Sequence, residues 1–406
     1  MDFKTHVLSN GIKLIHVQAE SPVAHCGFFI NIGSRDEDKN ECGMAHFIEH
    51  LFFKGTQKRK AFHVLSRLED VGGELNAYTS KEDTCIQASF LKDYYPRTVE
   101  LFSDIVFNST FPEKAMDSER AVILDEINSY KDSPSEFIFD DYEEHFFQNH
   151  PLGRNILGTA RQLKKIKQSD ILSFIRRKYN TDQMVFASVG NIPFNKLVYL
   201  FEKYFGSVPV NIRESERVLF NSYQPFNLAL KKHTHQVHAI IGNLGYSLND
   251  PRRMGVHLLS NIIGGPGMVS RLNLALRERR GYSYNVESSY NPYSDTGLFS
   301  VYFSSDKEYL EKCMEIIEKE FDNLRNKPLG TMQLKKARQQ IMGQLAISFE
   351  SNENQMLSIG KSYLVYDRVD SLEEIFAKIE VVTASELMQI ANEILNKDQM
   401  STLIYK

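Results

Sequence analysis

The stretch His46-Phe47-Ile48-Glu49-His50 lies in a segment whose apolar residues recur at the spacing of an α-helix that begins after Gly43. At about 100° per residue, His46 and His50 lie one turn apart on the same side of this helix. Two imidazoles in that relation can bind one metal ion. Glu49 lies about 60° from His46 and can accept a proton from a metal-bound water. The alternative is a pair of histidines on a partly buried helix, and a third ligand would decide between the two.

A second segment carries carboxylates that are suited to be that third ligand. Glu119 and Glu126 are seven residues apart, which is about two helical turns, so both face the same side of one amphipathic helix. Arg120 and Asp125 fit the alternative interpretation, a solvated charged face. From the residues alone, either glutamate can complete a zinc site, because zinc is often bound by two histidines and a carboxylate.

The segments around the motif mix strand-like and helical patterns without a regular βαβ rhythm. This mixture predicts an α+β fold rather than a doubly wound sheet. The helix before Gly72-Gly73 ends at a glycine stop signal. The expected strands are residues 11–17, 26–33 and 76–90, and the expected helices are residues 61–71, 95–107 and 117–130.

The pattern of the first half recurs in the second half. An apolar strand at 235–242 is followed by a helical segment in which His257 stands opposite His46. Ser260 and Asn261 then stand where the first half has its second pair of motif residues, so the second copy has lost the metal chemistry. The expected organisation is two homologous domains, residues 1–208 and 226–406, joined by a linker at 209–225.

Composition excludes several classes of protein. The chain has 406 residues, 42% hydrophobic and 25% charged, which is typical of a globular protein, and its net charge of −4 provides no basic field for nucleic acid or anionic lipid. The four cysteines are far apart and form no CxxC pair, so they are expected to be reduced thiols. No signal-like segment and no apolar run of ~18–20 residues is present, so we expect a cytoplasmic protein without a membrane partner.

His46-x-x-Glu49-His50, followed by Glu126 at 76 positions beyond His50, resembles the pitrilysin-type (M16) zinc metallopeptidase family. Its order is the inverzincin pattern, the reverse of H-E-x-x-H. Mitochondrial processing peptidase and insulin-degrading enzyme belong to this family. The resemblance implies that His46, His50 and Glu126 bind one Zn²⁺ per chain and that Glu49 is the general base. It also implies that Glu119 is an accessory carboxylate beside the site.

The segment Gly72–Ser80 is similar to the family element G-G-x-x-N-A-x-T-S, in which a strand edge aligns the substrate backbone. The resemblance implies that Asn76 and Ala77 contact substrate. An exposed strand edge suits this role because it offers unpaired N–H and C=O groups to an extended peptide. The alternative is an ordinary strand that starts after a Gly-Gly turn.

In the second half, Leu276–Tyr284 is similar to the family element R-x-x-x-G-x-x-Y. The resemblance implies that Arg277 anchors substrate and that Tyr284 donates a hydrogen bond to the developing oxyanion. The alternative is a basic helix end that is capped by Gly281.

The resemblance also implies a fold of two homologous α+β domains, each an antiparallel sheet with helices packed on one face. The implied function is a zinc endopeptidase that cleaves extended, unfolded peptides inside a dimer chamber. Because the chain carries both the zinc motif and the Arg/Tyr pair, a homodimer is expected first, and a heterodimer with an M16 homologue second. The alternative function is a catalytically silent or assembly subunit of a heterodimeric processing peptidase. The substrate, the cleavage preference, and whether Arg277 and Tyr284 act within or across subunits stay open.

Overall fold

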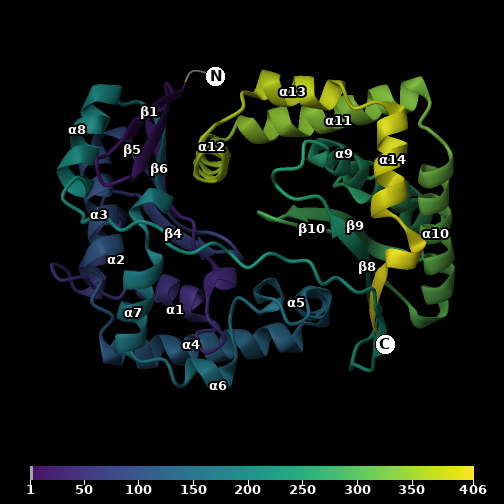
Figure 1. The fold of residues 1–406 in the computed structure, drawn as a ribbon, viewed down its shortest axis with the longest axis horizontal. Helices are drawn as coiled ribbons and strands as arrows, with labels where there is room; N and C mark the ends of the chain where they lie inside the picture. Colours follow the sequence, from purple (N-terminus) through teal and green to yellow (C-terminus); the bar gives the residue numbers. More distant parts are fainter. Residues whose placement is uncertain (1–2) are drawn as a thin grey trace. The chain divides into compact units, whose positions relative to one another are not determined.

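A computed structural model describes residues 3–406, which form two compact units (Figure 1). Each unit is assembled from three segments of the chain. The first contains the described residues as far as Asn128, together with 154–218 and 347–371. The second contains residues 129–153, 219–346 and 372–406.

The first unit is built on a six-stranded sheet with the order β1-β2-β6-β3-β5-β4. Its strands are β1 (Phe3–Val7), β2 (Lys13–Gln18), β3 (Val23–Ile30), β4 (Glu74–Thr79), β5 (Thr84–Leu91) and β6 (Met184–Gly190). Neighbouring strands are antiparallel except β2 and β6, which run parallel. β6 is buried along its whole length, as expected for a central strand that is covered on both faces. β4 ends the sheet, so one of its edges pairs with no other strand in the described chain.

Helices cover one face of this sheet and share a large apolar core with it (Figure 1). They are α1 (Met44–Leu51), α2 (Ala61–Glu69), α3 (Tyr95–Asn108), α4 (Glu113–Asp132), α6 (Ala160–Leu163), α7 (Gln168–Lys178) and α8 (Phe194–Phe205). The apolar residues of α3 recur at helical spacing, and Val99, Phe102 and Val106 are buried in this core.

The second unit has a five-stranded sheet with the order β7-β11-β8-β10-β9. Its strands are β7 (Asn227–Leu230), β8 (Val237–Gly245), β9 (Ser283–Pro292), β10 (Gly297–Ser305) and β11 (Ser401–Tyr405). β7 and β11 run parallel, and the other pairs are antiparallel. One face carries a second apolar core shared with α9 (Arg253–Gly264), α10 (Leu310–Asn326), α11 (Thr331–Phe349), α13 (Leu372–Glu380) and α14 (Ala384–Ile394).

Two helices are exchanged between the halves of the chain. α12 (Asn352–Tyr366) comes from the second half but packs on β3 and β6 of the first unit, opposite the main core. Its approach to β3 is close, since a Cβ on Gly360 would lie 2.2 Å from the Phe29 ring. α5 (Pro134–Phe146) comes from the first half and packs on β8 and β11 of the second unit. Each sheet is therefore covered on its second face by a helix from the other half.

The order of elements repeats along the chain. Apart from α2, which lies between α1 and β4, the helices and strands from β3 to α5 in the first half (β3-α1-β4-β5-α3-α4-α5) have the counterparts β8-α9-β9-β10-α10-α11-α12 in the second half. The predicted α+β class with two similar domains is confirmed, and the sheets are mixed rather than purely antiparallel because each contains one parallel pair. The expected strand at 76–90 is a hairpin, β4 and β5, whose turn lies at residues 80–83.

The compact units differ from the continuous domains 1–208 and 226–406 that the sequence suggested, because α5 and α12 are exchanged. Residues 209–226, which include the expected linker, contain neither helix nor strand. The described part of the chain has no helix long and apolar enough to cross a membrane. All four cysteines are free thiols, as expected.

Candidate metal centre

Helix α1 carries the three motif residues at the end of the first unit's core. Phe47, Ile48 and Leu51 face the core and are fully buried. The same helix therefore turns His46 and His50 toward the adjacent helix α4. Their ring centroids are 4.6 Å apart. The predicted helix and the predicted pairing of the two imidazoles are both present in the structure.

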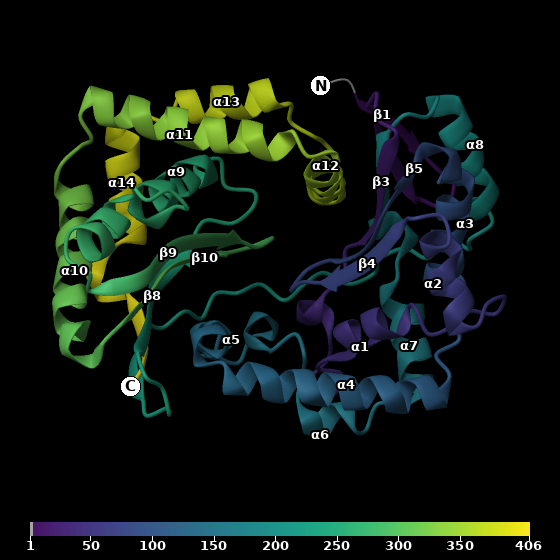
Figure 2. The same ribbon diagram turned by 180° about the vertical axis from the view of Figure 1, so that it is seen from behind.

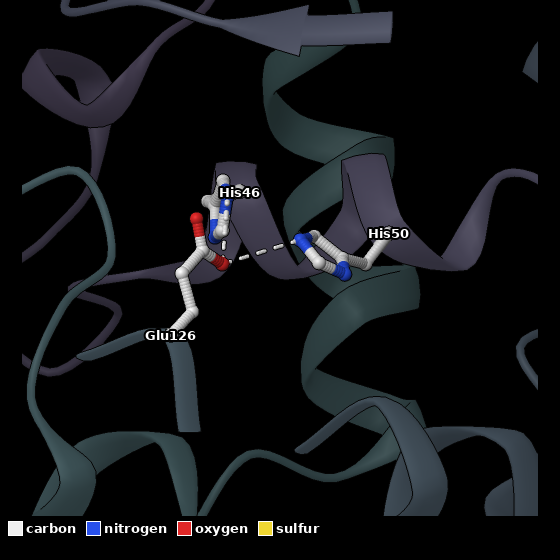
Figure 3. Close-up of side chains that lie close together, drawn as sticks. All are labelled: His46, His50 and Glu126. Carbon is white, nitrogen blue, oxygen red and sulfur yellow. Dashed lines mark ion pairs between the residues drawn. The ribbon is translucent and has the colours of Figure 1, made fainter. Parts of the chain in front are cut away.

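Helix α4 brings Glu126 to these histidines (Figure 3). Its Oε2 atom lies 3.8 Å from Nε2 of His46 and 3.6 Å from Nε2 of His50. One ligand atom from each of the three residues can be chosen so that all lie within 4.8 Å of one another. The residues that the resemblance assigned as ligands thus converge on one point, although Glu126 follows His50 by 76 positions in the sequence.

Glu119 approaches the other side of His50. Its Oε2 atom lies 3.2 Å from Nδ1 of His50, and its Oε1 atom lies 2.7 Å from Nζ of Lys54. Glu119 belongs to the buried stripe of α4, between Met116 and Ile123. A carboxylate that accepts Nδ1–H of a histidine fixes the ring orientation and leaves Nε2 free to bind a metal. Glu119 therefore lies behind His50, on the side of the ring away from Glu126.

The donor set fits a zinc ion. Two ligands of a tetrahedral zinc at 2.0–2.1 Å are about 3.4 Å apart, close to the observed 3.6 and 3.8 Å. His46 is only 7% exposed, and its Nδ1 atom is buried without a hydrogen-bond partner. Its Nε2 atom is too far from Glu126 for a hydrogen bond. The protein alone therefore leaves this imidazole poorly satisfied, and a metal at Nε2 would supply the missing interaction.

The electrostatics of His46 and Glu126 favour their metal-binding protonation states, whereas His50 is shifted toward its protonated form. Burial, and then the charge of the neighbouring His50, lower the pKa of His46 to about 4 against the opposing effect of Glu126, so the ring is neutral at pH 7. Burial also lowers the pKa of His50, but its interactions with Glu126 and Glu119 outweigh this effect and raise it overall. The interaction with His50 holds the pKa of Glu126 below its ordinary value, so this group is a carboxylate.

Glu49 is half-buried on α1. Burial raises the pKa of its carboxyl above the ordinary value, while the Thr79 hydroxyl and His50 oppose this shift. Because α1 packs against β4, which ends at Thr79, Glu49 lies near this end of the strand. Tyr179 lies close enough for the charge of Glu49 to raise the tyrosine pKa further, after burial has already done so. A carboxylate with a raised pKa is suited to take up and return a proton near neutral pH.

The strand β4 lies directly beside α1 (Figure 2). Asn76 and Ala77 are in this strand, opposite Gln87 and Ile86 of β5, and the far edge of β4 is the end of the sheet. The Asn76 side chain accepts a hydrogen bond from the backbone of Ala77 at 2.8 Å. An edge of the kind that the sequence predicted thus lies next to the zinc-motif helix.

Arg277 and Tyr284 both belong to the second unit. Arg277 lies in a π-helical segment, η5 (Asn273–Glu278), and its exposed side chain pairs weakly with Glu278 at 3.7 Å. Tyr284 is at the start of β9 and is 70% exposed. Both side chains are free to contact a ligand, and their roles stay predictions.

In the second unit, α9 takes the place of α1. His257 packs its ring edge-on against Tyr290 at 4.7 Å, and the hydroxyl of Ser260 is 2.9 Å from that of Ser288. Within residues 3–406, the His, Cys, Asp and Glu side chains close enough to share a metal form the single set in the first unit. The loss of metal chemistry in the second copy stays a prediction.

Sequence reasoning missed three groups around the site: Lys54, Thr79 and Tyr179. Lys54 follows α1 by three residues, and no local pattern relates it to Glu119. Thr79 is within the segment already recognised for substrate alignment, but its proximity to Glu49 depends on how β4 packs on α1. Tyr179 is 130 positions from Glu49 and carried no signal in the sequence.

The fold is shared with proteases of known structure. The chain superposes on the crystal structure of a protease from Helicobacter pylori with a TM-score of 0.92 and 21% sequence identity, covering 100% of this chain and 99% of that one. At this level of identity the likeness shows the fold, a duplicated α+β architecture.

Sequence comparisons define the family. Residues 14–160 match the family model described as insulinase (peptidase family M16), and residues 165–341 match the model described as the peptidase M16 inactive domain. The chain is 30% identical to YmxG, an uncharacterized zinc protease of Bacillus subtilis, over 99% of this chain and 98% of that protein. It is 32% identical to an uncharacterized zinc protease of Streptomyces coelicolor, over 91% and 82% of the two chains. The chain therefore belongs to peptidase family M16, a family of metallopeptidases.

Proposed function

We propose that this protein is a zinc-dependent endopeptidase that cleaves extended, unfolded peptides, with Glu49 as the general base. The observation that carries the proposal is that His46, His50 and Glu126 converge beside Glu49. Glu49 and the two histidines lie on α1, which contacts the edge strand β4. The relatives described as zinc proteases support the identity of the metal, and we propose one ion per chain.

The proposed reaction is hydrolysis of a peptide bond. A bound zinc ion would polarise the scissile carbonyl and acidify a water molecule. The carboxylate of Glu49 removes a proton from the water as the water oxygen attacks the carbonyl carbon. As the C–N bond breaks, the same carboxyl returns a proton to the leaving amine nitrogen, so Glu49 ends in its starting state. Its raised pKa suits both transfers.

The remaining groups hold this arrangement in place. Glu119 accepts Nδ1–H of His50, and the ion pair with Lys54 orients the Glu119 carboxylate. In the second unit, we propose that Arg277 anchors the substrate and that the Tyr284 hydroxyl donates to the oxyanion.

The substrate class follows from the edge of β4. An extended peptide can add to this edge by backbone hydrogen bonds along Asn76 and Ala77, which requires that the peptide be unfolded. Because β4 lies beside α1, a peptide bound there would pass the carboxylate of Glu49.

We further propose a cytoplasmic homodimer that encloses the site in a chamber. The second candidate is a catalytically silent or assembly subunit of a heterodimer. The match of residues 165–341 to a model described as an inactive domain supports this second candidate. That match covers the half of the chain that contains His257, which belongs to no set of side chains close enough to share a metal among the described residues.

Cleavage of an unbiased peptide library by the purified zinc-loaded protein, read by mass spectrometry, tests the proposal. The matched control is Glu49→Gln, which keeps the metal ligands. Cleavage by the wild type and its loss in the variant would support the endopeptidase. A wild type that binds zinc yet cleaves no member of the library, alone and at dimer-forming concentrations, would favour the silent subunit.

A further inference from the structure

We propose that Glu37 is a positioning residue of the metal centre: its buried carboxylate holds the first turn of α1 and thereby fixes His46 against Glu126. This inference rests on the proposed zinc site and extends it to a residue outside the motif. Glu37 lies nine positions before His46, in a loop. It has no assigned role in the reaction proposed above.

The carboxylate caps the helix from outside it. The residue at the N-cap position of α1 is Gly43, which has no side chain to accept the free N–H groups of the first turn. Glu37 supplies both acceptors instead: Oε2 receives the N–H of Gly43 at 3.0 Å, and Oε1 receives the N–H of Ala45 at 2.9 Å. Burial raises the pKa of the Glu37 carboxyl to about 8, while the N–H groups of Ala45 and Gly43 and the charge of Arg154 oppose this shift. The cap therefore depends on the two oxygen acceptors rather than on negative charge. Both oxygens of one side chain thus bind N–H groups within three residues of His46, at Gly43 and Ala45.

Glu37 is itself held rigidly. It is 3% exposed and follows the short 3₁₀ turn η1 (Ser34–Asp36). The residues on its N-terminal side are fixed by buried ion pairs, Arg35 with Glu82 at 2.7 Å and Asp36 with Arg217 at 2.8 Å. Because the backbone next to Glu37 is held in place, the Glu37 side chain can in turn hold the first turn of α1 in place.

A second loop, at residues 154–158, packs closely against the residues that lead into α1. Arg154 donates to the backbone carbonyl of Glu37. Gly43 has a φ of +89°, and a Cβ there would lie 2.8 Å from the carbonyl oxygen of Leu157. A Cβ on Gly158 would lie 2.4 Å from the carbonyl oxygen of Cys42. The backbone at Cys42 and Gly43 therefore has no room to move toward this loop. Glu37 in addition holds the N–H group of Gly43.

The consequence falls mainly on one ligand. His46 is in the first turn of α1, one residue after Ala45, whereas His50 is one turn further on and has its own support from Glu119. Nδ1 of His46 has no hydrogen-bond partner to orient the ring. The placement of His46 therefore depends on the backbone of the first turn, and so on Glu37.

The test uses Glu37→Gln in the full chain, with Glu41→Gln as the matched control. Glu41 is in the same loop, but its carboxylate bonds to the Asp38 backbone N–H and to Arg177 rather than to α1. Zn²⁺ affinity is measured by competition with a chelator, and the absorption spectrum of the Co²⁺-substituted protein reports the geometry of the ligands. Hydrogen exchange of metal-free protein, read by mass spectrometry, reports the stability of α1.

We expect Glu37→Gln to raise the Zn²⁺ dissociation constant ~10-fold or more, to alter the Co²⁺ spectrum and to speed exchange in α1, as for other groups that orient ligands. Glu41→Gln should leave all three unchanged. A purely structural role for Glu37 would lower resistance to urea without changing affinity or spectrum, and that result would overturn the inference. If Glu37→Gln does not fold, Glu37→Asp decides, since it keeps the carboxyl group but is one methylene too short to reach both N–H groups. Wild-type affinity in that variant would also overturn the inference.

The outcomes separate this inference from the proposed function. A wild type without Zn²⁺ affinity overturns both the metal centre and the role of Glu37. A wild type that binds Zn²⁺ but cleaves no peptide overturns the endopeptidase alone. Equal Zn²⁺ affinity in wild type and Glu37→Gln overturns the role of Glu37 alone.

Discussion

The Nδ1 atom of His50 lies 3.2 Å from Oε2 of Glu119, while Nε2 of the same ring faces Glu126. This relation gives each nitrogen of the imidazole one carboxylate and fixes which nitrogen is available to a metal. Glu119 is 8% exposed at its side chain, so water cannot easily replace it.

The first prediction is that Glu119→Ala weakens zinc binding. Loss of the carboxylate frees the His50 ring to rotate and leaves Lys54 without its partner, so we expect the dissociation constant to rise ~10–100-fold. Competition with a chelator measures it. The control is Asp117→Ala. Asp117 is on the same helix, and its exposed carboxylate forms an ion pair with Arg120. Equal affinity in the two variants would show that Glu119 does not orient the ligand.

The second prediction separates the base from a ligand. Glu49→Gln keeps His46, His50 and Glu126, so zinc should stay bound while turnover falls ~10²-fold or more. Glu126→Gln should lose both zinc and turnover. Metal analysis after dialysis and a peptide assay on the same samples give both quantities. Zinc loss from the Glu49 variant, or zinc retention at full affinity in the Glu126 variant, would reverse these assignments.

The features that the sequence made predictable are local. The spacing of His46 and His50, and of Glu119 and Glu126, is fixed by the helical repeat, and neither spacing depends on how the helices pack. The apolar periodicity of α1 and α3 likewise indicated helices with one buried face. The α+β class followed from these patterns together.

The features that escaped prediction depend on tertiary packing. The buried residues of α5 recur every four positions, at Ile138, Tyr142 and Phe146, which indicates a packed face but not the sheet that it covers. The exchange of α5 and α12 therefore could not be read from periodicity. The cap by Glu37 was also hidden, because a side chain six residues before Gly43 reaches the helix only through the fold of the intervening loop.

The third prediction concerns stoichiometry. Although the fold is duplicated, we expect one zinc per chain rather than two, because Ser260 and Asn261 replace motif residues in the second copy and His257 packs against Tyr290. Metal analysis of the protein after saturation and removal of free zinc gives the ratio. A second tightly bound equivalent that survives His46→Ala would contradict it.

The fourth prediction is a dependence of stability on pH that involves His257. Burial, and then the charge of Arg253, lower the pKa of this residue from 6.5 to about 4. The unfolded chain therefore binds a proton more readily than the folded chain between these two values. The contribution of neutral His257 to the free energy of unfolding is fully present above about pH 6.5 and is lost as the pH falls toward 4. The expected loss is about 1–2 kcal/mol at pH 5 relative to pH 7.

His257→Phe retains a ring against Tyr290 but cannot take up a proton. Urea unfolding of metal-free protein should show a smaller loss of stability between pH 7 and pH 5 in this variant than in the wild type. His63→Phe, at an exposed histidine of α2, is the control and should keep the wild-type difference. A His257→Phe protein with the wild-type pH dependence would refute the prediction.

The last prediction concerns where the second unit acts. Arg277 and Tyr284 belong to a unit that holds no metal-binding set among its described residues, yet the resemblance assigns them to the site at the metal. We predict that they act across the homodimer. Mixing a Glu49→Gln chain with an Arg277→Ala chain, each nearly inactive alone, then creates dimers with one complete site. That site combines the intact α1 of the Arg277→Ala chain with the intact Arg277 of the Glu49→Gln chain.

With random pairing, half of the dimers are mixed and one of the two sites in each is complete, so activity should recover to roughly a quarter of the wild-type value. Subunit exchange is verified in the same sample with chains of two isotopic masses. If each site is instead built within one chain, every site in the mixture carries one of the two substitutions. An exchanged sample without recovery would therefore place Arg277 and Glu49 of one site in the same subunit, while leaving the chemistry of each residue as proposed.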